Sequence, residues 1–248
     1  MRTSTPLPVL KGLRERIQRF EGGAARPRTA LPFGIKAIDQ HLPKGGLALG
    51  ALHEVAGGGN GAIDGAAAAL FAARARGQVL WCVTRQELFA PAIAQAGLLP
   101  DRVYVEAGDE PSVLTCFEEG LRHGALGAVV AEVAGLSMTA SRRLHLAAEG
   151  SGVIGIAIRR WRRQREATDF EQLTAAVTRW RVSTLPSTPL PMPGVGRARW
   201  QLELLRCQAA ERANFEVEAC DAKGRLALPS DPVHGSRPKE IKRHRAAG

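Results

Sequence analysis

Short apolar runs alternate with longer segments of helical composition along the middle of the chain, and this alternation constrains the fold most strongly. Apolar runs of this kind are typical of buried parallel strands, and strands separated by helices indicate βαβ units. The expected strands are 51–55, 78–84, 102–107, 126–136 and 152–160, and the expected helices are 64–76, 90–98, 111–124 and 141–151. We therefore expect an α/β protein with a mostly parallel central sheet flanked by helices.

A different pattern begins after residue 165. Segments 175–185, 197–207 and 214–228 alternate apolar and polar residues with a period of two, which is typical of half-buried strands. A loop rich in proline and glycine lies at 186–196, and residues 221–224 predict a hairpin turn. We expect these segments to form antiparallel strands at one edge of the sheet.

The length of 248 residues fits one large domain with extensions. We expect an amphipathic helix and a linker at 1–28, the α/β domain at 29–228, and a basic, disordered tail at 229–248. The helix can dock on its own domain or on a partner, and both alternatives are open. Its apolar stripe consists of Leu10, Leu13, Ile17 and Phe20.

The composition predicts a cytoplasmic protein that has no metal site, no cofactor and no membrane contact. No apolar run approaches the roughly 18 residues that a membrane-spanning helix needs. The first basic residue is not followed by the uncharged apolar segment of a signal peptide. The cysteines are scattered without metal-ligand spacing, which favours buried thiols. They are Cys82, Cys116, Cys207 and Cys220.

Three stretches carry the positive charge of the chain. Residues 1–28, 159–165 and 236–248 together have a net charge of +14, whereas the whole chain has +10 and the remainder therefore −4. A mildly acidic body with basic appendages suits a polyanion or an acidic protein surface. The alternative is that these arginines and lysines keep the protein soluble.

The stretch EVAGGGNGAID, residues 54–64, lies between a strand and a helix, where phosphate-binding loops occur. Such a loop needs G-x-x-x-x-G-K-[ST], in which lysine neutralises the phosphate and the hydroxyl holds magnesium. Ile63 and Asp64 stand at the lysine and hydroxyl positions. A cation–phosphate contact is worth up to about 4 kcal/mol near a protein surface, so we expect a degenerate loop without a bound nucleotide. Its glycines are Gly57, Gly58, Gly59 and Gly61.

Three segments resemble the RecA recombinase core in their order and spacing. They are LPFGIKAIDQHLPKGGLALGALHEVAG at 31–57, QVLWCVTRQELFAPAIAQAGLLPDRVYVEAGDEPSVL at 78–114, and AVVAEVAGL at 128–136, where that family has its Walker B strand. The resemblance covers about residues 30–160. It implies a RecA-like core, with the antiparallel strands added at its C-terminal edge.

Within that group the chain most resembles the ImuA family, RecA-like accessory proteins of bacterial error-prone DNA repair. The block from LPFG to HEV and the basic C-terminal region carry this resemblance. It implies a cytoplasmic adaptor in SOS-induced translesion synthesis that associates with the nucleoid during DNA damage. The implied partners are a polymerase-like mutasome subunit and an error-prone C-family DNA polymerase, with RecA and DNA as further candidates.

The chain departs from RecA at its catalytic positions. The Walker B aspartate corresponds to Ala131, and Glu132 follows on the opposite face of the strand. The glutamate that activates water in the recombinases corresponds to about Gln86, with Glu87 beside it. Together with Ile63, these changes remove the electrostatic positioning that phosphoryl transfer needs. We expect no catalytic residues; the alternatives are a SulA-like inhibitor of the cell-division GTPase and a weak, unconventional DNA-dependent ATPase.

Two basic segments are the candidate binding surfaces for nucleic acid or a partner. The run at 159–165 follows an expected core strand, so its arginines can meet phosphates while Trp161 stacks on a base. An acidic partner protein and a solvated loop are the alternatives. The pairs Asp39 with His41 and His53 with Glu54 lack a nucleophile at motif spacing. The binding candidates are Arg159, Arg160, Trp161, Arg162, Arg163, Arg165, Arg237, Lys239, Lys242, Arg243 and Arg245.

Overall fold

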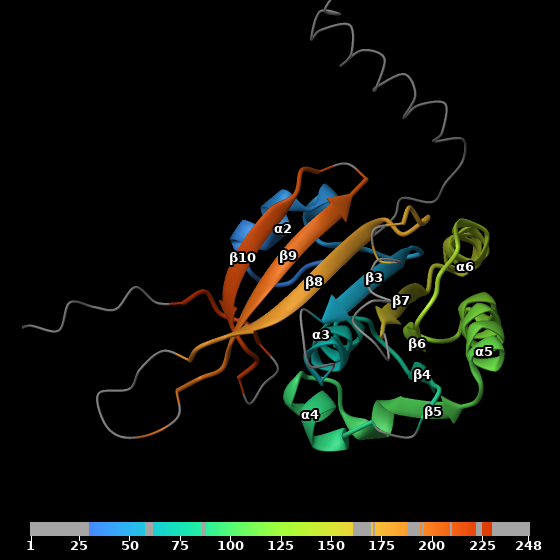
Figure 1. Ribbon diagram of the computed structural model, residues 1–248, viewed down its shortest axis with the longest axis horizontal. Coiled ribbons are helices and arrows are strands. Elements are labelled where there is room, and N and C mark those ends of the chain that lie inside the picture. The colour runs from blue at the N-terminus through green and yellow to red at the C-terminus, as the bar shows by residue number, and fades with distance from the viewer. Residues whose placement is uncertain are drawn as a thin grey trace, which may run out of the picture.

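An eight-stranded sheet forms the centre of the molecule, in the order β10-β9-β8-β3-β7-β6-β4-β5 (Figure 1). The computed structural model describes residues 30–57, 62–85, 88–160, 170, 172–187, 194, 196–208, 210–221 and 225–229, and the side chains of 62–64 are excepted. The strands are β3 (Leu52–Gly57), β4 (Val79–Val83), β5 (Val103–Ala107), β6 (Ala128–Val133), β7 (Ile154–Arg159), β8 (Thr178–Leu185), β9 (Arg199–Cys207) and β10 (Ala213–Glu218).

Helices cover both faces of the parallel part of this sheet (Figure 1). One face packs against α3, α4 and the segment at 30–51 that precedes β3; this segment contains α2, and we call it the lead-in. The other face packs against α5 and α6. A separate pair of short strands, β1 and β2, belongs to the lead-in. These elements are β1 (Ala30–Leu31), α2 (Lys36–His41), β2 (Leu47–Ala48), α3 (Ala62–Ala73), α4 (Ala90–Gln95), α5 (Glu110–His123) and α6 (Met138–Ser151).

The predicted α/β architecture is confirmed, with one correction to strand direction. Strands β3 to β8 pair in parallel, and β9 and β10 extend the sheet antiparallel. Segment 175–185 was expected to be antiparallel at the edge, but its strand β8 runs parallel to β3 and antiparallel to β9. A period of two indicates that one face is buried and carries no information about direction.

The two helices on the second face begin and end with matching local signals. Asp109 accepts a hydrogen bond from the Ser112 amide (2.9 Å) at the start of α5, and Ser137 caps α6 in the same way. Both helices end at a glycine in the left-handed conformation, with φ of 74° at Gly124 and 81° at Gly152. Short polar caps and left-handed glycines satisfy the end groups that a helix leaves unpaired. The C-terminal ends agree with the expected helices, whereas α6 begins at Met138, before the expected residue 141.

One carboxylate stabilises a turn within the lead-in segment, and an aromatic ring next to that turn packs on the core. Asp39 accepts hydrogen bonds from the amides of Phe33 (2.6 Å) and Gly34 (2.9 Å). The Phe33 ring lies 5.2 Å from the Phe71 ring of α3 and 5.7 Å from the Trp180 ring of β8. The lead-in therefore links α3 to β8 through an aromatic cluster.

Segments 1–29 and 230–248, which contain the predicted N-terminal helix and tail, lie outside the described residues. None of the described helices has both the length and the apolar character to cross a membrane.

Two glycine-to-alanine substitutions should shift stability in opposite directions. A Cβ on Gly127 would lie 2.0 Å from the backbone oxygen of Arg76, whereas a Cβ on Gly150, an exposed position in α6, would meet nothing within 4 Å. Gly127→Ala should therefore lower the free energy of unfolding by about 2–3 kcal/mol through overpacking. Gly150→Ala should raise it by up to about 1 kcal/mol through helix propensity. Urea unfolding of both variants measures this; a Gly127→Ala protein as stable as the wild type would contradict it.

Candidate functional site

The glycine loop joins β3 to α3 at the carboxyl edge of the parallel strands. Strand β3 ends at Gly57 and α3 begins at Ala62, so Ile63 and Asp64 lie in the first turn of the helix. Gly58, Gly59 and Gly61, like Gln86 and Glu87, lie outside the described residues. In phosphate-binding proteins this turn presents its amides and the positive end of the helix dipole to the anion.

An arginine–glutamate pair lies beside this turn. Arg160, directly after β7, donates from Nη1 to Glu132 of β6 (2.8 Å). A Cβ on Gly65 would lie 3.3 Å from Nη2 of Arg160, so the guanidinium packs against the helix backbone at that glycine. Trp81 of β4 approaches the same carboxylate, with 3.5 Å between its Nε1 and Oε1. The pair brings a fixed cation and a fixed anion close to the place where a nucleotide phosphate would approach.

Glu132 and Ala131 point to opposite sides of β6, as the sequence predicts. Ala131 packs in the core beneath α5 and α6, while Glu132 contacts Trp81, which belongs to the core beneath α3 and α4. The carboxylate is therefore on the α3 side, and its side chain is 9% exposed. It is held by Arg160, which leaves its charge balanced without a metal ion.

A second charged cluster is buried at the centre of the sheet, around Glu54 of β3. Arg159 of β7 donates to Oε2 of Glu54 (2.9 Å), and Arg179 of β8 donates to Oε1 (3.1 Å). The Glu54 and Arg159 side chains are fully buried, and that of Arg179 is 6% exposed. One carboxylate thus joins the two strands that flank β3.

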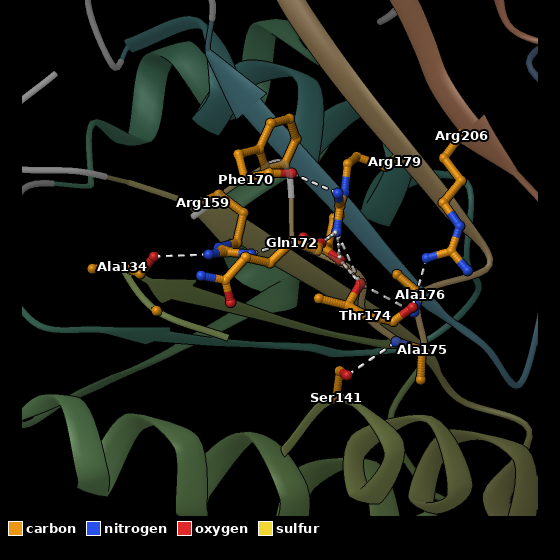
Figure 2. Close-up of polar contacts among 12 residues, drawn as sticks. Ala134, Ser141, Arg159, Phe170, Gln172, Thr174, Ala175, Ala176, Arg179 and Arg206 are labelled. Atoms are coloured by element: carbon orange, nitrogen blue, oxygen red, sulfur yellow. Dashed lines mark hydrogen bonds and ion pairs between the residues drawn. The ribbon is translucent and has the colours of Figure 1, made fainter. Parts of the chain in front are cut away.

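The segment before β8 closes over this cluster (Figure 2). Arg179 donates to the backbone oxygens of Phe170 (2.5 Å) and Gln172 (2.8 Å), and Thr174 donates its hydroxyl to Glu54. The Phe170 ring centroid lies 4.9 Å from the guanidinium carbon of Arg179 and 5.9 Å from that of Arg159. The cluster therefore holds the described residues Phe170, Gln172 and Thr174 against the sheet.

Strands β8, β9 and β10 form a three-stranded ribbon, and its face opposite the lead-in is covered by none of the described helices (Figure 1). This face carries a basic hollow of about 670 Å³. Arg212 is exposed, the Arg181 side chain is 41% exposed, and Arg206 donates to the Thr174 backbone oxygen (2.6 Å). Exposed arginines of this kind can bind carboxylates or phosphates. The lining residues are Phe170, Leu173, Arg179, Arg181, Leu205, Arg206, Cys207, Ala210, Glu211 and Arg212.

The two described residues of the basic run at 159–165 differ in burial. Arg159 ends β7 and is 1% exposed on Glu54, so it does not face a surface that phosphate could reach, contrary to the sequence-based prediction for it. Arg160 is half-buried on Glu132. The other predicted binding residues lie outside the described residues; they are Leu10, Leu13, Ile17, Phe20, Trp161, Arg162, Arg163, Arg165, Arg237, Lys239, Lys242, Arg243 and Arg245.

The two acid–histidine pairs named from the sequence have other contacts. Asp39 caps the lead-in turn, and His41 is 2.7 Å from the backbone oxygen of Glu211. His53 is buried between the Thr178 hydroxyl (2.7 Å) and the Ala48 oxygen (2.9 Å). Burial lowers the pKa of His53 to about 4, so the ring is neutral at pH 7. No group of three or more metal-ligating side chains occurs within the described part of the chain.

Sequence reasoning did not find the Glu54 cluster or the basic hollow. The available signal was the presence of Glu54 within the mostly apolar strand β3, because charged residues are buried there only with partners. The partners are far apart in the chain, because Arg159 lies 105 positions and Arg179 lies 125 positions after Glu54. A single sequence cannot pair residues over such separations.

Removing one arginine from the buried cluster should destabilise the protein strongly. Arg159→Met leaves the fully buried Glu54 with one guanidinium, and breaking a buried pair costs about 3–5 kcal/mol. The matched control is Arg225→Met, which removes an exposed bridge to Asp221 and should cost less than about 1 kcal/mol. Urea unfolding of both variants at pH 7 checks this, and equal losses would contradict it.

His53 should make the protein less stable in acid. Its pKa is about 4 in the folded chain and 6.5 in an unfolded one, so the unfolded state binds more protons between these values and stability falls as the pH falls. The shift corresponds to a loss of about 3 kcal/mol across this window. His53→Gln should flatten that part of the stability profile, measured by urea unfolding from pH 7 to pH 4. An unchanged slope would show that another group causes the acid sensitivity.

Comparisons with known proteins agree with this geometry. The structure matches a crystal structure of the RadB recombinase with a TM-score of 0.53 and 14% identity, over 81% of this chain and 100% of that one. At this identity the match shows the fold, which is RecA-like. No family model matches the chain.

Curated relatives cover most of the sequence. Protein ImuA of Caulobacter vibrioides (strain NA1000 / CB15N) is 36% identical over 216 residues, which are 82% of this chain and 88% of the relative. Protein ImuA of the strain ATCC 19089 / CIP 103742 / CB 15 matches with the same values. Identity at this level over this length shows that the chain belongs to the ImuA family.

Proposed function

We propose that this protein is a non-catalytic RecA-like adaptor in SOS-induced, error-prone translesion DNA synthesis. It would bind a polymerase-like mutasome subunit and an error-prone C-family DNA polymerase, with RecA and DNA as further partners, in the cytoplasm and at the nucleoid during DNA damage. The family membership and the RecA-like fold support the accessory role. The adaptor mechanism is supported by the contacts around α3.

The pair formed by Arg160 and Glu132 carries the proposal. Both side chains lie next to the first turn of α3, with the Arg160 guanidinium against Gly65. A nucleotide phosphate at this turn would approach the carboxylate of Glu132, and the charge of Arg160 is already balanced by that carboxylate. An ion pair that is already formed inside the protein therefore competes with the ligand.

The residues at positions 63 and 64 also oppose the binding of a nucleotide phosphate. Ile63 supplies no cation and Asp64 adds a carboxylate where magnesium needs a hydroxyl. Losing about 4 kcal/mol from a micromolar affinity of about 8 kcal/mol leaves roughly millimolar binding. A chain with these residues is suited to use its fold as a platform and not as a phosphoryl-transfer catalyst.

Partner binding would use the basic surfaces. The hollow on the β8–β9–β10 ribbon presents Arg181 and Arg212 to solvent, and the basic run and tail add charge in the sequence. Exposed arginine contacts are screened within about 8 Å at physiological ionic strength. Complexes formed through these surfaces should weaken as salt increases.

A tagged pull-down from DNA-damaged cells tests the adaptor role. We expect polymerase subunits among the bound proteins, identified by mass spectrometry, and we expect their loss in Arg162→Glu with Arg163→Glu or on deletion of 229–248. Arg159 is left unchanged because it is buried. The control is Arg142→Glu, a charge reversal at an exposed position of α6, compared with Arg162→Glu and Arg163→Glu made singly.

The alternatives predict different results. Recovery of the division GTPase without polymerases would favour a SulA-like inhibitor. Micromolar binding of Mg-ATP to the purified protein, measured by calorimetry, would favour an unconventional ATPase and contradict the non-catalytic mechanism. The expected result is binding no tighter than millimolar.

A further inference from the structure

A β-bulge brings apolar and basic side chains together in the basic hollow on the β8–β9–β10 ribbon. Arg179 of β8 pairs with Arg206 of β9. The next residue of β8, Trp180, pairs with Leu204, which leaves Leu205 as the extra residue of β9. Consecutive residues of a regular strand face opposite sides, but an extra residue bends the strand and redirects the neighbouring side chains. Leu205 and Arg206 therefore both line the hollow.

Leu173, another residue of the lining, is exposed although the backbone on both sides of it is held in place. It is 67% exposed. The backbone oxygen of Gln172, directly before it, accepts a hydrogen bond from Arg179 (2.8 Å). The backbone oxygen of Thr174, directly after it, accepts one from Arg206 (2.6 Å; Figure 2). An apolar side chain presented to solvent from a fixed backbone costs little entropy when a partner docks against it.

The hollow has more positive than negative charge, and much of the positive charge is available to a ligand. Four of its ten described lining residues are arginines, and Glu211 is the carboxylate among them. The Arg181 side chain is 41% exposed and lies 4.0 Å from Glu203, at the outer limit of an ion pair. Arg206 uses Nη1 on the backbone, and Arg212 is exposed and makes no ion pair with the described residues. These three guanidinium groups retain donors for carboxylates.

This mixture of side chains suits a peptide better than a nucleic acid. Single-stranded nucleic acids stack on exposed aromatic rings along a basic groove, but Phe170, the aromatic residue of the lining, is 4% exposed and packs against Arg179. The hollow of about 670 Å³ falls within the roughly 300–1,000 Å³ of sites that enclose compact ligands. Leu173 and Leu205 can contact apolar groups there, while arginines bind carboxylates through paired hydrogen bonds.

We propose that the basic hollow is the docking site for an acidic segment of a partner protein, in which one or two large apolar residues lie between carboxylates. The apolar residues would pack on Leu173 and Leu205. The carboxylates would pair with Arg181, Arg206 and Arg212. This inference rests on the adaptor function proposed above, since it names the chemistry by which one of the partners is recognised.

Segments of this chain suit the hollow less well than a segment of another protein. Residues 1–28 and 230–248 are basic, so the arginines of the hollow would repel them. A second copy could offer 101–110, which has four carboxylates and one arginine. Two of these carboxylates are engaged within the chain, because Asp109 caps α5 and Glu110 accepts hydrogen bonds from the amides of Ala134 (3.2 Å) and Gly135 (3.3 Å).

Fluorescence anisotropy with the labelled peptide Asp-Asp-Leu-Leu-Asp-Asp tests the proposal on the full chain. We expect the wild type to bind this peptide. It should bind Asp-Asp-Ser-Ser-Asp-Asp, which lacks the apolar residues, and Lys-Lys-Leu-Leu-Lys-Lys, which has the opposite charge, at least tenfold more weakly. Leu173→Ser and Arg212→Glu should each weaken binding of the first peptide at least tenfold, because they remove the apolar contact and reverse one of the paired charges.

Two matched controls lie on α6. Leu146→Ser changes an apolar residue with 64% exposure, and Arg142→Glu reverses the charge of an exposed arginine. Leu146 lines a smaller hollow with Arg122 and Arg143, so this control also tests a second place where apolar and basic side chains meet. Both controls should bind as the wild type does. The melting temperatures of all four variants should change little, because the altered residues are exposed.

Equal affinity of Leu173→Ser and the wild type would overturn the proposal, as would equal binding of the acidic and basic peptides. Tighter binding of a labelled oligothymidylate than of the acidic peptide would identify nucleic acid as the ligand. A wild-type dimer in sedimentation that Arg212→Glu dissociates would identify a second copy, and either result would overturn the proposal. If the wild type does not bind the acidic peptide but the pull-down recovers polymerase subunits, this docking site is wrong and the adaptor role stands. Peptide binding without polymerase subunits in the pull-down would support the docking site and contradict the adaptor role.

Discussion

The carboxylate of Glu54 is the contact on which the arrangement of the sheet depends. It lies in the central strand β3 and receives hydrogen bonds from Arg159 of β7 and Arg179 of β8. The first arginine belongs to the half of the sheet that contains β7, and the second to the half that contains β8, which is parallel to β3 and pairs with the antiparallel strand β9. Charges at this depth are tolerated only when each is paired, so the cluster couples the two halves and specifies which strands are neighbours of β3.

Much of the fold was predictable because its signals are local. Apolar runs and helix-ending glycines such as Gly124 located the strands and helices, and side-chain alternation placed Glu132 opposite Ala131. The predicted direction of β8 was wrong relative to β3. A half-buried strand has the same alternation of side chains in either orientation. Arg159 was assigned to a surface because its partner Glu54 is 105 residues away, and a run of arginines does not show which of them turns inward.

Three surfaces that differ in charge lie at different places on the central sheet. The carboxyl edge beside α3 has its charges paired internally through Arg160 and Glu132. The ribbon at one end of the sheet has the basic hollow, and the strand β5 at the other end is open and acidic. Surfaces of opposite charge therefore lie at opposite ends of one sheet.

The contact between Arg160 and Gly65 also limits which residues suit the start of α3. A lysine introduced at position 63 would stand in the same helical turn as Gly65, against which the Arg160 guanidinium packs. Two cations at the positive end of a helix repel one another and the dipole. Arg160 therefore makes the first turn of α3 a poor place for a second cation, so a phosphate site could not be created there by one substitution at position 63.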